Sequence, residues 1–387
     1  MRTSRWFAVG QASGSDAEPG RRAADQALVG SDPRLLIVFC SESLDLVETV
    51  RQIDRRSGGA PLIGCSTAGE IGSNGPDDAG VLVAAFGGDG FSVSTAIARN
   101  ASRNLRAAGE YVAGCLSSAD DRPHRVLLLL TDGLAGNQQE VVRGAYAILG
   151  AGVPLVGGCA GDDLKMTRTF QMYGDEVVTD SVVAAGLTSD APLGIGVRHG
   201  WRKLGEPMLA TRSGGDRVYE LDDEPALDVY LDRLNHADCI PLSQEELARI
   251  ALRHPLGLSR RDGEEQIRFI TGGDFTERAL RCAAEVPQGG LVWIMEGDAE
   301  SVLAATDAAC LDSLASLDGN PPLGLLAFDC IARRGVLGEQ GIKAEIDRIA
   351  AIARGAPVAG FYTYGEIARK SGMSGFHNQT LVVLSIA

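Results

Sequence analysis

The sequence has 387 residues, of which 45% are hydrophobic and 22% are charged, a composition typical of a globular chain with a large core. A chain of this length predicts two domains, because single cores stop growing at roughly 250–300 residues. The net charge is −15, with 36 Lys and Arg against 51 Asp and Glu. That charge opposes binding to nucleic acid or to an anionic membrane surface.

The N-terminal residues, treated as a lead-in over 1–30, contain no long apolar core of the kind that a secretory signal needs. No uncharged apolar stretch reaches about 18 residues, so we expect no membrane insertion. We therefore expect a cytoplasmic protein.

Strand and helix patterns alternate in the first half. The apolar run Leu35–Phe39 is typical of a strand that is buried on both faces. Leu46, Val50 and Ile53 follow at helical spacing, and Ser57–Gly59 ends that helix. A second short strand begins at Pro61.

The next segments, Val81–Phe86 and Phe91–Ile97, predict two strands paired with each other around the glycine-rich turn 87–90. Val126–Leu130 predicts another fully buried strand, followed by the loop 131–133.

A helix is expected to begin at Asn137, with Glu140 completing a capping box. Val141, Ala145 and Ile148 line one face of it, and Gly150 ends it. The order strand, loop, helix predicts an α/β fold, with largely parallel or mixed sheets flanked by helices.

The polar stretch Thr211–Asp223 predicts a domain boundary near Leu221, which gives one α/β domain over 31–220 and a second over 221–387. Pro225 opens a helix after the boundary. Further on, the runs Leu291–Met295 and Leu323–Phe328 predict strands. A helix over Ile342, Ile346 and Ile349 ends at Gly355.

A weak internal repeat occurs three times, at Pro61–Glu70, Pro154–Asp162 and Pro357–Glu366. Each copy has proline, a short apolar strand, a glycine-rich loop and then an acid. Such loops lie at the carboxyl ends of parallel strands, where ligands usually bind, and the acid could hold an amine or cap local N–H groups. Turn geometry alone is the alternative explanation. The candidate ligand-binding residues are Gly64, Cys65, Ser66, Thr67, Gly69, Glu70, Asp132, Gly158, Asp162, Cys330, Arg333, Tyr362, Tyr364 and Glu366.

Several of these residues have two possible roles, one in ligand binding and one in the structure. Asp132 ends a strand and could bind an amine or a metal, or could cap the following turn. Tyr362 and Tyr364 would share one face of an extended chain and, with Glu366, could form an aromatic and acidic pocket. Arg333 and Arg334 could hold a ligand carboxylate, although a solvated surface pair is more common.

Several motifs together resemble the FIST family, a tandem of an N-terminal and a C-terminal FIST domain. They are Gly64–Ile71, Gly157–Asp162, His199–Trp201, Asp222–Tyr230, Cys330–Arg333, Gly360–Ile367 and His377–Thr380. The resemblance implies a sensory role in signal transduction, with a small ligand such as an amino acid and a separate signalling partner. Some members resemble haem-bound nitric oxide sensors that work with histidine kinases or with diguanylate cyclases and phosphodiesterases.

We therefore expect a sensor and not an enzyme, and two alternatives for its chemistry stay open. A haem sensor would use His199 or His377 as the axial ligand; neither is part of a covalent haem-attachment motif. A thiol-dependent enzyme would use Cys65 or Cys330 as a nucleophile, although buried structural thiols are more common. A pure interaction scaffold is a third possibility.

Overall fold

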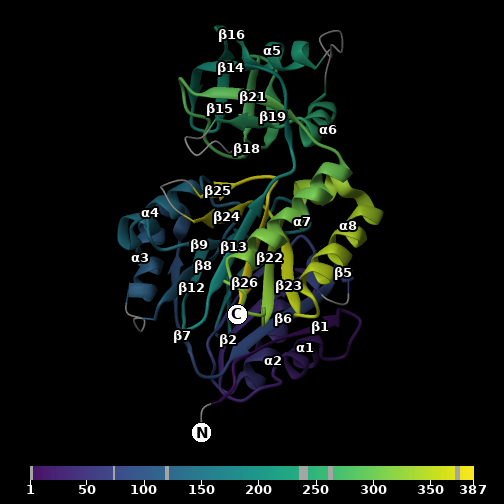
Figure 1. The fold of residues 1–387 in the computed structure, drawn as a ribbon. Helices are drawn as coiled ribbons and strands as arrows, with labels where there is room; N and C mark the ends of the chain where they lie inside the picture. Colours follow the sequence, from purple (N-terminus) through teal and green to yellow (C-terminus); the bar gives the residue numbers. More distant parts are fainter. Residues whose placement is uncertain (1–2, 73–74, 118–121, 235–242, 260–264, 371–374) are drawn as a thin grey trace.

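The computed structural model describes residues 3–72, 75–117, 122–234, 243–259, 265–370 and 375–387. Its main body consists of three six-stranded mixed sheets (Figure 1). The first sheet has the order β1 (Trp6–Ser13), β6 (Gly80–Gly87), β2 (Pro33–Cys40), β3 (Leu62–Ser66), β10 (Gln171–Tyr173), β11 (Glu176–Val178). The second has the order β7 (Phe91–Arg99), β12 (Ser181–Ser189), β8 (His124–Thr131), β9 (Leu155–Cys159), β24 (Glu366–Arg369), β25 (Phe376–His377). The third has the order β13 (Leu193–Arg198), β26 (Leu381–Ile386), β22 (Gly324–Cys330), β23 (Val358–Thr363), β4 (Glu70–Gly72), β5 (Gly75–Asp77).

The three sheets share one plan. In each, the two central strands are parallel, and every other neighbouring pair is antiparallel. The hairpin that follows the second parallel strand leaves its own sheet: β4–β5 joins the third sheet, β24–β25 joins the second, and β10–β11 joins the first. The three sequence repeats are therefore three structural repeats that exchange hairpins in a cycle.

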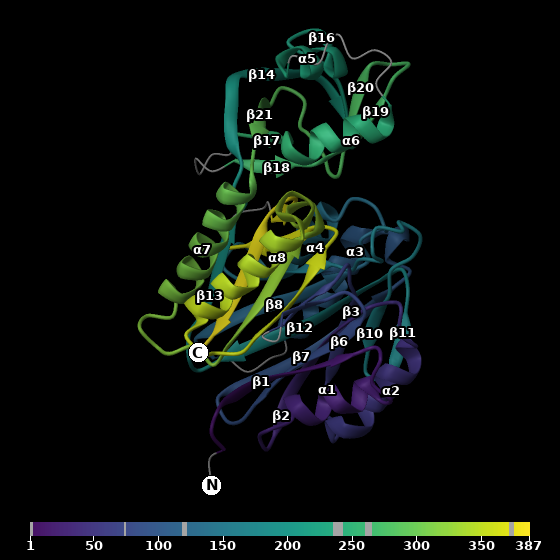
Figure 2. The same ribbon diagram turned by 90° about the vertical axis from the view of Figure 1, so that its right-hand side faces the viewer.

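The inner faces of the three sheets form one common core. At its centre Phe39 of the first sheet lies 4.8 Å from Phe361 and 6.2 Å from Phe328, both of the third sheet, measured between ring centroids. Helix pairs cover the outer faces (Figure 2). They are α1 (Pro19–Ala27) with α2 (Leu46–Ser57), α3 (Leu105–Ser117) with α4 (Gln139–Leu149), and α7 (Ala299–Ala315) with α8 (Ile331–Ala353).

Local sequence explains where these helices begin and end. Asp45 caps α2 by accepting a hydrogen bond from the Glu48 N–H, and Gly58 ends the helix in the left-handed conformation. A longer helix, α8, contains a break at Gly338, where φ is 62° and ψ is 177°. The first half of α8, residues 331–337, therefore runs in a different direction from the second half.

A separate unit is inserted in the third repeat, between β13 and α7, and it has its own hydrophobic core (Figures 1 and 2). It contains α5 (Ala226–Arg233) and α6 (Gln244–Arg253). Its eight-stranded sheet is built from β14 (Arg202–Gly214), β15 (Arg217–Leu221), β16 (Glu224–Pro225), β17 (Leu256–Leu258), β18 (Gln266–Arg268), β19 (Ile270–Asp274), β20 (Ala279–Cys282) and β21 (Leu291–Glu296). We call this segment, 202–296, the inserted unit.

The predicted α/β class is confirmed, as are the strands at Leu35–Phe39 and Val126–Leu130. The predicted pairing of Val81–Phe86 with Phe91–Ile97 is wrong, because β6 pairs in the first sheet and β7 in the second. The glycine-rich turn between them carries the chain from one repeat to the next.

The expected capping box at the start of α4 is also wrong. Gln138 stands at the N-cap, Asn137 accepts from the Gln139 N–H, and the Glu140 carboxylate pairs with Arg143. Ile148, expected on the buried face, is 48% exposed.

Candidate functional site

The three loops that follow β3, β9 and β23 each lead into a hairpin that joins another sheet. These loops meet at one end of the body, where main-chain hydrogen bonds join them in a ring. The N–H of Gly161 donates to Ser66 O, that of Ala68 to Tyr362 O, and that of Tyr364 to Cys159 O, at 3.0–3.1 Å. These N–H groups therefore hold the repeats together and do not point at a ligand.

A glycine stands at the same strand position in each repeat, just before the loop. A Cβ on Gly64, Gly157 or Gly360 would lie 2.5, 1.8 or 2.0 Å from a carbonyl oxygen of the neighbouring parallel strand. Gly158 likewise leaves room for the Thr363 methyl group, which would lie 2.7 Å from a Cβ there. The first three glycines thus allow the two parallel strands within each sheet to lie close together, and Gly158 allows packing between the second and third sheets.

Two acids of the repeat are internal. The Thr67 hydroxyl donates to Glu70 and the Thr363 hydroxyl to Glu366, and both glutamates are fully buried. The Thr380 N–H donates to the second oxygen of Glu366 at 3.1 Å. Burial raises the pKa of Glu70 well above its usual range and that of Glu366 to about 8. These carboxyls stabilise the loops from inside.

The third acid, Asp162, organises the loop that follows it. Its carboxylate accepts from three successive N–H groups, those of residues 166–168, and from the Tyr364 hydroxyl. Burial acts to raise the pKa of Asp162, but these hydrogen bonds outweigh it and lower the pKa below its usual range. Asp132 likewise organises the chain around it, because its carboxylate accepts from the Leu134 N–H and from the Thr169 hydroxyl at 2.7 Å.

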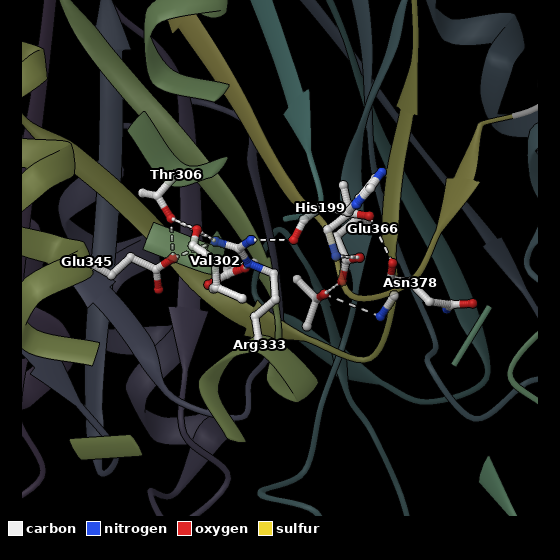
Figure 3. Close-up of polar contacts among 11 residues, drawn as sticks. His199, Val302, Thr306, Arg333, Glu345, Glu366 and Asn378 are labelled. Atoms are coloured by element: carbon white, nitrogen blue, oxygen red, sulfur yellow. Dashed lines mark hydrogen bonds and ion pairs between the residues drawn. The ribbon is translucent and has the colours of Figure 1, made fainter. Parts of the chain in front are cut away.

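Arg333 belongs to a buried charge cluster at the start of α8 (Figure 3). Its guanidinium donates to Asp329 at 2.6 Å, to Glu345 at 2.7 Å, and to the main-chain oxygen of His199 at 2.9 Å. All three charged side chains are fully buried, so Arg333 is neither a solvated surface residue nor free to bind a ligand carboxylate. Burial raises the pKa of Asp329 well above its usual range, and nearby Glu345 raises it further.

The two tyrosines of the third repeat point to different places. Tyr362 is fully buried beneath Arg334, whose guanidinium carbon lies 5.1 Å from the ring centroid. Tyr364 is half-buried, donates from its hydroxyl to Asp162, and accepts from the Leu164 N–H at 2.6 Å. Tyr362 and Tyr364 therefore do not form a pocket with Glu366.

Cys65 and Cys330 are buried, as are most described cysteines; Cys239 lies outside the described residues. Burial raises the pKa of both thiols well above the usual range. A nucleophilic cysteine needs the opposite, an accessible thiolate.

We expect iodoacetamide at neutral pH to leave Cys65 and Cys330 unlabelled in the folded protein, because protonated, buried thiols react slowly. Partly exposed Cys115 serves as an internal reference. Peptide mapping by mass spectrometry before and after denaturation measures the labelling. Rapid native labelling of Cys65 or Cys330 would contradict this arrangement and favour the thiol enzyme.

The two candidate haem ligands both make hydrogen bonds within the protein. The Nδ1 atom of partly buried His199 accepts from the Trp201 N–H at 3.0 Å, and burial lowers its pKa to about 4. The Nε2 atom of buried His377 lies 2.9 Å from the Ala368 oxygen. Axial ligation of haem needs a ring nitrogen that is free and accessible.

A hollow of about 560 Å³ opens beside the ring of loops. Ala68 of the first repeat, Asp163 and Leu164 of the second, and the first half of α8 surround it. The lining residues are Ala68, Asp78, Asp163, Leu164, Ile331, Arg334, Gly335, Gly338, Glu339 and Ile342. None of them is among the candidate ligand-binding residues chosen from the sequence, although Ala68, Asp163 and Arg334 are immediate neighbours of residues in that list.

A larger hollow of about 840 Å³ lies at the opposite end of the third repeat, lined by the last turns of α7 and α8. That end carries the amino termini of the parallel strands. Ligands of α/β folds bind at the carboxyl ends, where the smaller hollow lies.

Comparison with known proteins assigns nearly the whole chain to two family models. The FIST N domain matches residues 34–224, and the FIST C domain matches residues 226–369. The 560 Å³ hollow is lined from both matched ranges.

Two relatives are similar over long segments. An uncharacterized protein of Methanocaldococcus jannaschii is 26% identical over 287 residues, covering 68% of this chain and 54% of the relative. An uncharacterized protein of Mycobacterium tuberculosis is 28% identical over 237 residues, covering 59% of this chain and 60% of the relative. The chain thus matches little more than half the length of each relative. None of the described helices is long and apolar enough to span a membrane.

Proposed function

We propose that this chain, which belongs to the FIST family of signal-transduction sensors, binds a small amine-bearing metabolite such as an amino acid in the 560 Å³ hollow. It acts by binding and not by catalysis. The observation that carries the proposal is the position of the hollow, at the carboxyl ends of the strands and between the two matched FIST domains.

Both kinds of charge that an amino acid needs line the hollow. Arg334 offers a guanidinium, whose two outer nitrogens donate to Ala68 O at 2.9 Å and to Asp78 at 2.7 Å. Half-buried Asp163 offers a carboxylate, and burial together with nearby Glu42 and Asp78 raises its pKa. The proposal therefore moves the amine anchor from Asp162, which is saturated with hydrogen bonds, to its neighbour.

A signal can leave the hollow through the first half of α8. Ile331, Arg334 and Gly335 line the hollow, while Val336 and Leu337 pack in one cluster with Ile267 of the inserted unit. A ligand that shifts this half-helix at the Gly338 break would move the inserted unit and change the surface seen by a separate partner. A cytoplasmic histidine kinase, or an enzyme that makes or degrades cyclic-di-GMP, remains the proposed partner class. The alternative of a haem sensor has less support, because neither His199 nor His377 lines the hollow.

We expect Ala68→Tyr to abolish ligand binding while the protein stays folded, because the new ring would fill the hollow. Calorimetric titration with the common amino acids measures binding, and hydrogen exchange with a bound amino acid should show protection over 66–69 and 331–337. Ala68→Leu gives a smaller blocking side chain in case the tyrosine impairs folding.

The matched control is Ala315→Tyr, which places the same ring at the larger hollow at the other end of the third repeat. It should leave binding unchanged. Undiminished binding by a folded Ala68→Tyr protein, or protection confined to other segments, would remove the hollow as the sensory site.

A further inference from the structure

The hollow is one of three equivalent positions in the three repeats. The residues that donate the ring hydrogen bonds, Ala68, Gly161 and Tyr364, occupy the same place in each loop. Each loop lies over the chain that leaves the central strand of a neighbouring repeat. In the register of the paired central strands, Cys40, Thr131 and Asp329 occupy equivalent positions. The residue beneath each loop lies two positions further along the chain, at Glu42, Gly133 or Ile331.

At two of the three positions a side chain from the loop already contacts the residue beneath it. Tyr364 packs over Gly133, where a Cβ would lie 2.9 Å from the tyrosine Cβ. The longer loop of the second repeat reaches Glu42 through an ion pair with Lys165. At the third position the loop supplies only the methyl group of Ala68, and the space over Ile331 is the hollow.

The shape and charge of this unfilled position define an occupant. Its apolar lining comes from Ala68, Leu164, Ile331 and Ile342. Its charged lining contains three acids and one arginine. Arg334 donates to Asp78 and to the Ala68 carbonyl, and the lining holds two more carboxylates than basic side chains.

Resting on the proposed function, we infer that the hollow selects a small organic cation with an apolar body of about the size of a tyrosine side chain. The ring of the ligand packs on Ile331 in the same way as Tyr364 packs on Gly133. The protonated amine lies against Asp163 and Glu339, where a half-buried ion pair is stronger than one in water. Ala68 is the residue that determines specificity, because its small size keeps the position open.

Four probes separate the parts of this inference. Tyramine carries the ring and the cation, 4-hydroxyphenylacetate the ring and an anion, methylamine the cation alone, and L-tyrosine the ring with both charges. We expect calorimetric titration of the full chain to detect tyramine, with weaker binding of L-tyrosine and none of the other two at millimolar concentration.

Asp163→Asn removes one anchoring charge without straining the chain, since residue 163 has a φ of 53° and asparagine tolerates the left-handed conformation. We expect it to weaken tyramine binding about tenfold or more, whereas Asp347→Asn, on the exposed side of α8, should leave it unchanged.

The outcomes separate the two proposals. Equal or tighter binding of 4-hydroxyphenylacetate, or an Asp163→Asn protein that binds tyramine normally, overturns the cation assignment; if Ala68→Tyr still blocks binding, the sensory site stands. Tyramine binding that survives Ala68→Tyr overturns the location and the proposed sensory site together. Failure of tyramine to bind at millimolar concentration overturns the selectivity for a cation with a ring, and the amino-acid titration then judges the sensory site separately.

Discussion

Replacing Arg333 with methionine is expected to lower the free energy of unfolding by about 3–5 kcal/mol, because two fully buried carboxylates lose the guanidinium that pairs with both of them. Removing one partner of a buried charge cluster costs more than the cluster itself contributes, since the remaining charges cannot regain water. Chemical denaturation followed by circular dichroism measures the loss. The effect also reaches the end of β13, since Arg333 donates to the main chain of His199 at 2.9 Å.

The control for this variant is Arg348→Met, on the same helix. Arg348 pairs with Asp307, but both side chains are well exposed, at 44% and 36%. An exposed pair contributes at most about 1 kcal/mol. Equal losses for the two variants would contradict the role assigned to burial.

The loss in Arg333→Met should depend on pH with a definite sign. Burial already raises the pKa of Asp329 in the folded protein, and removal of Arg333 raises it further. Between this folded pKa and the unfolded value of about 3.9, the folded variant binds more protons than the unfolded chain. Its stability should therefore rise as pH falls from this folded pKa towards 4.

Gly360→Ala is expected to cost more than about 3 kcal/mol, enough to prevent folding of a protein of ordinary stability. A Cβ there would lie 2.0 Å from the Ala327 carbonyl oxygen in the middle of the third sheet, and backbone cannot move aside as a flexible side chain can. Soluble yield and the denaturation midpoint measure the effect.

The repeats make this prediction sharper. Gly157→Ala should be as severe, because the Cβ contact would be 1.8 Å and φ is already +146°, whereas Gly64→Ala, at 2.5 Å, should be milder. Gly152→Ala is the control, because nothing lies within 4 Å of a Cβ at that position. A tolerated Gly360→Ala would mean that the parallel strands of the third repeat are not this close.

The sequence predicts where the loops of the candidate site lie, but not what the individual acids in those loops do. Proline, apolar strand, glycine and acid recur at Pro61, Pro154 and Pro357, and the loops do lie at the carboxyl ends of parallel strands. The roles of the acids could not be read in this way. Glu70 and Glu366 face inward onto threonine hydroxyls, while Asp163, one residue after a motif acid, faces the hollow.

The sequence by itself determined the α/β class, the buried strands, the helix ends set by residues such as Gly58 and Gly150, and the existence of three related segments. Those features depend on neighbours within a few residues, which local pattern records. Only the tertiary structure decided that the repeats exchange hairpins, that Arg333 is buried, and that Ala68 leaves one of three equivalent positions open. Each of these features depends on contacts between residues more than ten positions apart. The unpaired edge of a strand can hydrogen-bond to any other strand that the packing of the whole chain brings to it.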